Sequence, residues 1–255
     1  MHPRMAFAVA ALVLAAACGG TGAPPAQGAP GAGAQRVDPA TAGTVTGRVV
    51  FEGTPPQNSL VRMSGDPQCR NEGEVRFENY VVTDGGLDNV FVHVKDGLGS
   101  YDFGAPAEPV KLDQQGCRYV PHVLGVRTGQ PLKIKNSDAT MHNVHAAAEA
   151  NRAFNMGQPL QNQVDTRTFA KAEVMVPFKC DVHGWMLAYV GVLDHPYFSV
   201  TRDGGRFELK GVPAGTYTIE AWHEKLGVQT QKVTLADKQT AEVTFTFKAP
   251  AAAGN

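Results

Sequence analysis

The stretch from Lys179 to Met186 has the sequence Lys-Cys-Asp-Val-His-Gly-Trp-Met, and the interpretation of the chain starts from it. It places Cys180, His183 and Met186 three residues apart, so these side chains lie close together if the stretch forms one tight loop. The stretch from 136 to 143, Asn-Ser-Asp-Ala-Thr-Met-His-Asn, contributes a second histidine, His142. Together the two stretches offer a thiolate, two imidazoles and a thioether, all of which are metal ligands.

This set of ligands favours copper. A thiolate and two imidazoles with a weak axial thioether suit both oxidation states of copper, so we expect one copper ion held by His142, Cys180, His183 and Met186. Zinc is the competing metal, but the methionine is a soft ligand and the sequence has no His-Glu-x2-His motif. A two-copper centre would need a second cysteine on the ligand loop, which is absent. The alternative without metal is a packed turn around a buried thiol.

The segments around the two stretches predict an all-β chain. Short runs rich in β-branched residues alternate with Gly, Pro, Asn and Asp, which is the pattern of strands and turns. These runs are Val123 to Val126, Leu132 to Ile134, Ala172 to Phe178 and Leu187 to Leu193. The alanine-rich segment from Ala146 to Phe154 lacks alternation and predicts either a short helix or an irregular loop.

The segment from Lys111 to Asp194 resembles the cupredoxin family, and the Cys-x2-His-x2-Met spacing is that of its amicyanin-like members. The resemblance implies a Greek-key β-barrel over residues 97–196, with His142 on the loop after the strand at Leu132 to Lys135. It also implies that the other three ligands share the loop between the last two strands. Asn143 would then tie the two ligand loops together without binding the metal.

The resemblance further implies an electron-exit rim of Gly184, Trp185 and Leu187 beside the exposed edge of His183. A small apolar rim suits brief contacts with a partner protein. The alternative is that Trp185 belongs to the core. Gly184 and Met141 stand where the family often has proline, which is expected to loosen both ligand loops.

The C-terminal part predicts a small antiparallel sandwich. From Ser199 onward, Asp-Gly-Gly-Arg-Phe and Val-Pro-Ala-Gly-Thr-Tyr closely resemble the carboxypeptidase regulatory-like, transthyretin-type β-sandwich. That family opens with two strands of the kind found at Gly43 to Gly53 and Leu87 to Val94. The resemblance therefore implies a sandwich of residues 44–96 plus 197–248 with the copper segment inserted. Two sequential domains are the alternative.

The N-terminal residues predict export. Arg4, an apolar run from Ala6 to Ala17 and small residues before Cys18 indicate a signal peptide of residues 1–18, and the sequence before Cys18 resembles a lipoprotein box. Residues 19–43 predict a flexible linker and residues 249–255 a disordered tail. We expect a lipid on Cys18 that anchors the protein in the periplasm, at the outer membrane or cell surface.

The roles of the remaining cysteines and histidines are predicted from the compartment and from their positions along the chain. In an oxidising compartment Cys69 and Cys117 are expected to form a disulfide, and two free buried thiols are the alternative. We expect His122, His145 and His195 to face solvent or bond to backbone carbonyls, although a second metal site among them stays open. His93 and His223 are expected to pack within sandwich strands.

The charge composition and the motifs missing from the sequence argue against two classes of function. The chain has 23 Lys and Arg against 24 Asp and Glu without a block of like charge, so nucleic acid is not an expected partner. It has no Gly-x-Ser-x-Gly elbow, phosphate loop or dinucleotide fingerprint, so we do not expect an enzyme. We expect a blue copper protein that carries single electrons between redox partners, such as a cytochrome or a copper enzyme. Copper delivery or sensing, suggested by the extra histidines and Met141, Met156 and Met175, and a metal-free adhesion or scaffold role are the alternatives.

Overall fold

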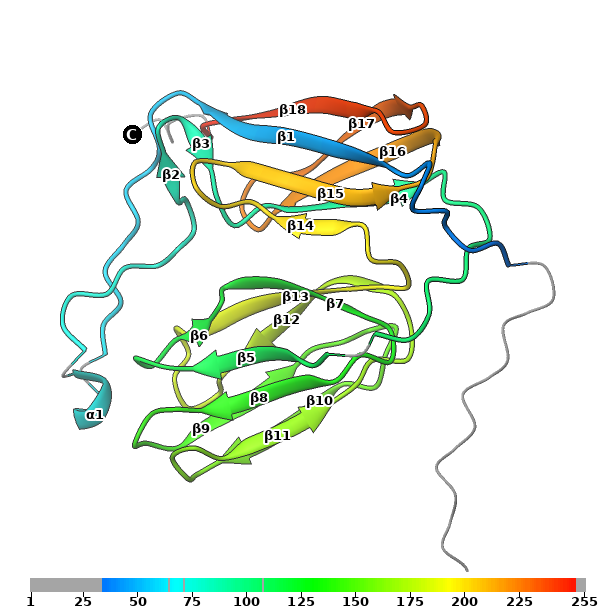
Figure 1. Cartoon of the computed structure of the whole chain (residues 1–255). Helices are drawn as coiled ribbons and strands as arrows, with labels where there is room; N and C mark the ends of the chain where they lie inside the picture. The colour runs from blue at the N-terminus through cyan, green and yellow to red at the C-terminus, as the bar shows by residue number, and fades with distance from the viewer. Residues whose placement is uncertain (1–33, 64, 71, 107, 251–255) are drawn as a thin grey trace, which may run out of the picture. The chain divides into compact units, whose positions relative to one another are not determined.

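The computed structural model describes residues 34–63, 65–70, 72–106 and 108–250 (Figure 1). The predicted signal peptide, its lipidation site Cys18 and most of the predicted linker lie outside these residues. In the part of the chain that is described, no helix is long and apolar enough to cross a membrane.

The described residues form one short helix and eighteen strands, so the all-β prediction is confirmed. The elements are β1 (Gly43–Glu52), α1 (Pro67–Arg70), β2 (Val82–Thr83), β3 (Gly86–Leu87), β4 (Phe91–Asp96), β5 (Val110–Gln114), β6 (Tyr119–Val120), β7 (Val123–Arg127), β8 (Leu132–Asn136), β9 (His142–Ala146), β10 (Phe154–Gln158), β11 (Val164–Arg167), β12 (Glu173–Lys179), β13 (Leu187–Leu193), β14 (Phe198–Val200), β15 (Arg206–Val212), β16 (Gly215–His223), β17 (Gly227–Leu235) and β18 (Thr240–Lys248).

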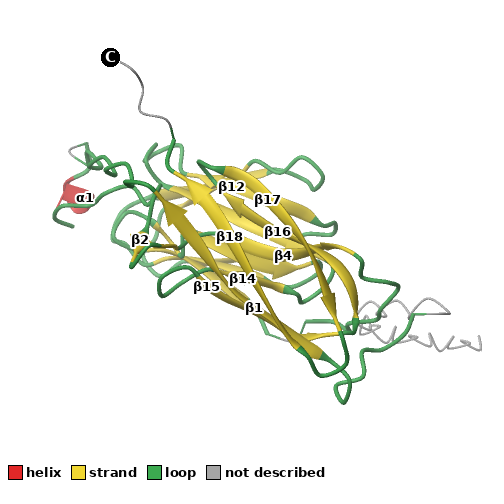
Figure 2. Cartoon of the chain, turned by 90° about the horizontal axis from the view of Figure 1, so that it is seen from above, coloured by secondary structure: helices red, strands yellow, loops and turns green. Residues whose placement is uncertain are grey.

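Two of the four sheets combine strands from the beginning and the end of the described chain. One has the order β15-β1-β3-β2, with β18 pairing in parallel to β1, and the other has the order β14-β4-β16-β17 (Figures 1 and 2). Apolar side chains from both sheets, such as Val49, Phe245 and Ile219, form one buried cluster. We call this pair of sheets the sandwich.

The other two sheets are built from β5 to β13. Their orders are β10-β9-β12-β13-β7 and β11-β8-β5-β6, and they share a second buried cluster that includes Ile134, Phe178 and Val190. We call them the central sheets, because the strands on either side of them in the sequence belong to the sandwich. The strands expected over residues 97–196 form two facing sheets, and among the described residues no hydrogen-bonded path closes these sheets into one barrel.

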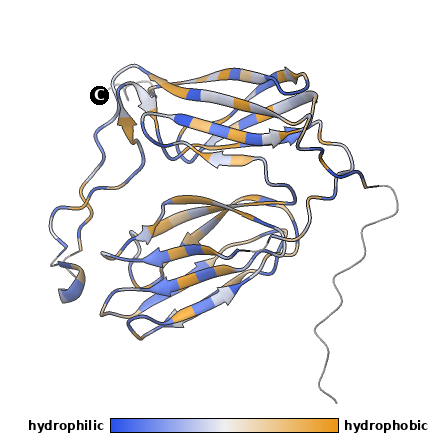
Figure 3. Ribbon diagram, in the orientation of Figure 1, coloured by the Kyte–Doolittle hydropathy of each residue, from blue (hydrophilic) through white to orange (hydrophobic). Residues whose placement is uncertain are grey.

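The strands follow the alternation of the sequence. In β8, Leu132 and Ile134 are buried and Lys133 between them is exposed, and in β15 the buried Phe207 and Leu209 flank the exposed Glu208. Figure 3 shows this alternation of hydrophobic and hydrophilic residues along the ribbons. Because side chains of a strand point to opposite faces in turn, strands such as β8 and β15 bury one face and leave the other to solvent. β4 and β13 are buried on both faces, because a further apolar cluster with Phe91 and Leu193 lies on their second side.

The structure describes two segments for which the sequence predicted no strand. Residues 147–153 form no helix and connect β9 to β10 as an irregular loop, so of the two predictions for this segment the loop is confirmed. The described end of the predicted linker is held by backbone hydrogen bonds. The amide of Gln35 donates to Ser100 (3.0 Å), its carbonyl accepts from Asp102 (2.9 Å), and the carbonyl of Thr41 accepts from Lys238 (2.9 Å).

The chain leaves the sandwich and returns to it at neighbouring positions. β4 pairs antiparallel with β14, with Phe91 opposite Val200 and His93 opposite Phe198. Phe91 also reaches the central sheets, where a Cβ on Gly191 would lie 2.4 Å from the Phe91 ring. The absence of a side chain at Gly191 therefore allows Phe91 to pack against β13.

Candidate metal centre

Two adjacent strand ends bring the predicted ligands together. His142 is the first residue of β9, and Cys180, His183 and Met186 lie in the connection from β12 to β13. β12 pairs with β9, with Lys179 opposite His145, so the ligand connection starts beside the histidine strand. A backbone hydrogen bond from the amide of Met186 to the carbonyl of His183 (2.9 Å) closes the connection into a tight turn.

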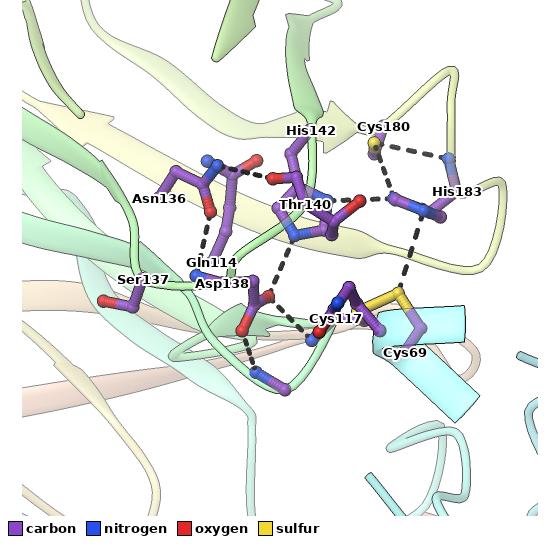
Figure 4. A network of polar contacts seen from close by, with 12 residues as sticks. Cys69, Gln114, Cys117, Asn136, Ser137, Asp138, Thr140, His142, Cys180 and His183 are labelled. Atoms are coloured by element: carbon purple, nitrogen blue, oxygen red, sulfur yellow. Dashed lines mark hydrogen bonds and ion pairs between the residues drawn. A yellow bond between two sulfur atoms is a disulfide. The ribbon is translucent and has the colours of Figure 1, made fainter. Parts of the chain in front are cut away.

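The donor atoms of His142, Cys180 and His183 converge on one buried point (Figure 4). The two Nδ1 atoms lie 2.9 Å apart, the Cys180 Sγ lies 3.8 Å from the His183 Nδ1, and all three donor atoms lie within 4.8 Å of one another. The side chains are almost fully buried, with at most 2% of each residue exposed. Two imidazole nitrogens and one sulfur thus face a common centre.

The Cys180 sulfur is arranged to carry negative charge. The backbone amides of Asn143 and His183 each donate to Sγ at 3.4 Å. Burial disfavours ionisation, but the hydrogen bond with His142 and the two backbone N–H groups outweigh it, and the pKa of the Cys180 thiol is lowered. A stabilised thiolate is the form of cysteine that binds metal ions.

The far side of the His142 ring is bonded to Asp138. The His142 Nε2 lies 2.9 Å from the Asp138 carboxylate, which also accepts the backbone N–H groups of Gly116 (2.8 Å) and Cys117 (2.9 Å). Burial opposes protonation of His142, but Asp138 and the Cys180 thiolate outweigh it and raise the pKa of His142 to about 9. Without metal, His142 is therefore the cationic partner that donates its Nδ1–H to His183.

The far side of the His183 ring is bonded to a second carboxylate, from Asp66. The distance from the His183 Nε2 to the Asp66 Oδ2 is 3.0 Å, and the Thr140 hydroxyl donates to the same oxygen at 2.7 Å. The bond with Thr140 is the main reason that the pKa of Asp66 falls to about 2. Burial, together with the charge of His142, lowers the pKa of His183 in spite of Asp66, so the ring is neutral.

Neither Asp66 nor Asp138 was predicted from the sequence. A signal for Asp138 was present, because it precedes His142 by four residues on the same loop. The signal for Asp66 was indirect: it precedes Cys69 by three residues, and the predicted bridge would bring that segment to Cys117. Asp66 and His183 are 117 residues apart, so no short sequence motif contains both of them.

The predicted disulfide between Cys69 and Cys117 is confirmed, with Cα atoms 5.6 Å apart. Both half-cystines are buried and pack against Met63, Val75 and the partly buried Trp185. The Cys69 sulfur lies 3.7 Å from the His183 Nε2. The disulfide therefore attaches the segment that carries Asp66 to the loop that precedes β6.

Asn143 joins the two ligand connections. Its side-chain oxygen accepts the backbone N–H of Asp181, and its amide nitrogen donates to the Asp181 carboxylate at 3.2 Å. The backbone of Asn143 also bonds to the Cys180 sulfur, as described above. This is the linking position that the family resemblance implied for Asn143.

Met186 and the three predicted rim residues surround an opening beside the sulfur ligand. Met186 is 2% exposed and belongs to the same apolar cluster as Cys180. Both residues, together with Gly184, Trp185 and Leu187, line a cavity of about 660 Å³. Trp185 is tied down, because its Nε1–H donates to the Cys117 carbonyl at 3.0 Å and its ring centre lies 5.0 Å from that of His183.

The other histidines have protein partners. His122 bonds to the Leu187 carbonyl (3.0 Å) and to Glu224, His145 lies 3.1 Å from the Asp181 carboxylate, and the His195 Nδ1 accepts the backbone N–H of Tyr197 (3.2 Å). His93 and His223 are buried in sandwich strands. Among the described residues, every group of side chains with metal-binding geometry contains His142 or His183, and none contains these five histidines.

The chemistry of the donor atoms fits copper. Two ring nitrogens and a stabilised thiolate point to one centre, and a thioether is buried in the same cluster, which is the set that suits both copper(I) and copper(II). The carboxylates of Asp66 and Asp138 bond to the opposite ring nitrogens, so they orient the imidazoles. The other two candidate groups each use a sulfur that is in the disulfide.

No protein family model and no curated protein sequence matches the chain. The solved structures that resemble part of it are cupredoxin-like copper proteins. A copper(I) amicyanin variant has 24% identity and a TM-score of 0.30, covering 33% of this chain and 81% of amicyanin. The purple cupredoxin from Nitrosopumilus maritimus has 19% identity and a TM-score of 0.28, covering 32% of this chain and 98% of the cupredoxin.

A copper-containing nitrite reductase from Thermus scotoductus SA-01 has 14% identity and a TM-score of 0.32. The match covers 56% of this chain and 28% of the reductase. These similarities are partial and their TM-scores are low.

Proposed function

We propose that this protein is a type 1 copper protein that carries single electrons between redox partners. His142, Cys180 and His183 would bind the copper in one plane, and Met186 would be the weak axial ligand. The observation that carries the proposal is the convergence of two imidazole Nδ1 atoms and one stabilised sulfur in a buried site.

The surroundings of the ligands favour electron transfer over chemistry on a substrate. A bound copper ion would supply a one-electron redox couple. The chain holds the three ligands other than Met186 through a second contact: two backbone amides on Cys180, Asp138 on His142 and Asp66 on His183. Ligands held in this way move little when the charge of the site changes, which keeps reorganisation small.

Absorption spectroscopy with metal analysis tests the proposal. Protein loaded with one equivalent of copper(II) is expected to show an intense visible band from sulfur-to-copper charge transfer, and Cys180→Ser is expected to abolish it. His195→Gln, which removes a histidine outside the ligand group, serves as the control and is expected to keep the band. A colourless wild-type protein that binds copper stoichiometrically would refute electron transfer by a type 1 site.

Copper delivery is the second candidate, and the cavity beside Cys180 and Met186 favours it, since a partner's ligand could approach the metal there. Of the methionines that suggested this role, Met141 is exposed, whereas Met175 is buried and Met156 is half-buried. Transfer of copper(I) to a chelating acceptor faster than reduction and re-oxidation by a soluble electron carrier would favour delivery. Fast reversible redox without transfer would reject it.

We further propose that the protein is exported and anchored through a lipid on Cys18, with its redox partner in the same compartment. The Cys69–Cys117 disulfide supports an oxidising compartment. Metabolic labelling with a fatty-acid analogue is expected to label the wild-type protein and to miss Cys18→Ala. Equal labelling of both would reject the anchor and leave the copper site unaffected.

A further inference from the structure

The outer edge of His183 is covered by a part of the chain that is remote in sequence. His183 is 2% exposed, and its Nε2 lies 3.0 Å from the carboxylate of Asp66, 117 residues earlier. The segment that carries Asp66 lies between β1 and β2, two strands of the sandwich. This contact therefore joins a sandwich connection to the ligand loop of the central sheets.

The Asp66 carboxylate is itself held in place. One oxygen accepts the Thr140 hydroxyl (2.7 Å), and the other accepts the backbone N–H of Gln68 (2.8 Å). Three residues further on, Cys69 is joined covalently to Cys117, whose amide donates to Asp138, the partner of His142. Each ligand imidazole thus has one carboxylate on its far side. The disulfide connects the Asp66 segment to Cys117, which bonds to Asp138 behind His142 (Figure 4).

We propose that Asp66 is a positioning residue for the metal site: it holds the Nε2–H of His183, so that the Nδ1 lone pair is directed at the metal, and closes this edge of the site to solvent. The proposal rests on the proposed function, because it takes His183 to be a copper ligand. A neutral imidazole carries its proton on one nitrogen and a free lone pair on the other. Since an ionised carboxylate can only accept, Asp66 requires the proton on Nε2.

Because Asp66 covers the outer edge of His183, solvent can approach the site only from another side. The cavity beside Cys180 and Met186 is lined on the sulfur side of the centre, whereas Asp66 and Cys69 lie against the Nε2 edge of His183. The proposal therefore places contact with solvent on the sulfur side.

NMR of the copper(I)-loaded protein with labelled histidine tests the inference. Wild type is expected to show His183 with a proton on Nε2 that exchanges slowly with water. Asp66→Ala is expected to speed this exchange at least 10-fold and to weaken copper(I) binding, measured by competition with a chelator, by roughly 10- to 100-fold. Glu74→Gln, a matched loss of one carboxylate from the same connection, is expected to change neither, because Glu74 is exposed and pairs with Arg76.

Thr140→Val provides a second variant in case Asp66→Ala folds poorly, as judged by circular dichroism. It removes the hydroxyl that holds Asp66 and is expected to shift exchange and affinity in the same direction by a smaller factor. If folded Asp66→Ala or Thr140→Val keeps the wild-type exchange rate and affinity, the inference is overturned and the proposed function stands. If wild type does not bind copper, the proposed function fails. In that case, the exchange rate of the His183 Nε2–H in the metal-free protein shows whether Asp66 holds this proton.

Discussion

The sandwich and the central sheets both bury histidines, but they do so in different ways. In the sandwich, His93 pairs with Glu220 (3.3 Å) and His223 accepts the backbone N–H of Lys225 (3.3 Å). In the central sheets, His142 and His183 face each other and a thiolate. Burial of a histidine is therefore common to both regions, and convergence of free donor atoms distinguishes only the central sheets among the described residues.

The difference shows what makes a metal site in this chain. In the sandwich, His93 bonds through both ring nitrogens, whereas His223 bonds through Nδ1 and its buried Nε2 has no partner among the described residues. Neither histidine belongs to a group of side chains with metal-binding geometry. His142 and His183 each use one nitrogen for a carboxylate, and their remaining nitrogens lie together beside a sulfur. The carboxylates are as important to this arrangement as the ligands, because they decide which nitrogen stays available.

The largest expected effect separates the two kinds of histidine. His142→Gln is expected to lower copper affinity more than about 100-fold, since even loss of an outer hydrogen-bond partner costs roughly 10- to 100-fold. His93→Gln is expected to leave copper affinity unchanged and to lower the free energy of unfolding by about 1 to 3 kcal/mol, because Glu220 loses a buried partner. Chelator competition and urea unfolding measure the two quantities. Equal loss of affinity in both variants would break the comparison.

Removal of the disulfide is expected to have the next largest effect, because this bond joins a sandwich connection to the central sheets. The double variant Cys69→Ala with Cys117→Ala opens a loop with a sequence separation of 48 residues. By the chain-entropy estimate this lowers the free energy of unfolding by about 4 kcal/mol. Urea unfolding of the metal-free protein measures the change. A loss below about 1 kcal/mol would mean that the segment with Asp66 is held mainly by its noncovalent contacts.

The pH dependence of stability reports on His223 in the sandwich. Burial lowers its pKa from 6.5 to about 4. Between these values the unfolded chain binds more protons than the folded one, so the contribution of His223 to stability is complete above pH 6.5 and is lost as the pH falls to about 4. The loss is at most about 3 kcal/mol, and His223→Gln is expected to remove it.

Urea unfolding of the metal-free protein at pH 7 and pH 4.5 measures this difference. The same sensitivity in His223→Gln would show that other groups are responsible.

The smallest expected effect concerns Tyr119, which braces both ligand strands. Its hydroxyl lies 2.9 Å from the Asn143 carbonyl and 3.0 Å from the Lys179 carbonyl. Tyr119→Phe is expected to lower the free energy of unfolding by roughly 1 kcal/mol, the usual net value of a hydrogen bond. The visible copper band should keep its wavelength, since no ligand is removed. A displaced band would show that the brace sets the ligand geometry.

Local patterns in the sequence predicted much of this structure. Alternation of apolar residues predicted the strands, because one face of each sheet must be buried. The spacing in Cys-x2-His-x2-Met predicted that Cys180 and His183 are neighbours, and export predicted the Cys69–Cys117 bridge. These features depend on residues close in sequence or on the compartment, so they can be deduced without a fold.

Features that depend on long-range packing were missed. The division of the central strands into two sheets was not predicted, because strand pairing is decided by neighbours that no periodicity reveals. Asp66 was overlooked, since its partner His183 lies 117 residues later in the sequence and only the fold brings the two side chains together. Trp185 is partly buried against the disulfide and also lines the cavity beside Cys180, and its role in electron exit stays a prediction.

The pairing of β4 with β14 has a consequence for where such a chain can be lengthened. The two strands lie side by side and antiparallel, with His93 opposite Phe198, so they form a hairpin whose tip is the whole of residues 97–197. A tip that begins and ends at adjacent points can be lengthened or exchanged without moving the strands beneath it. Such a tip is the position at which a hairpin accepts an inserted segment, and a loop of about two to five residues would join the same two strands.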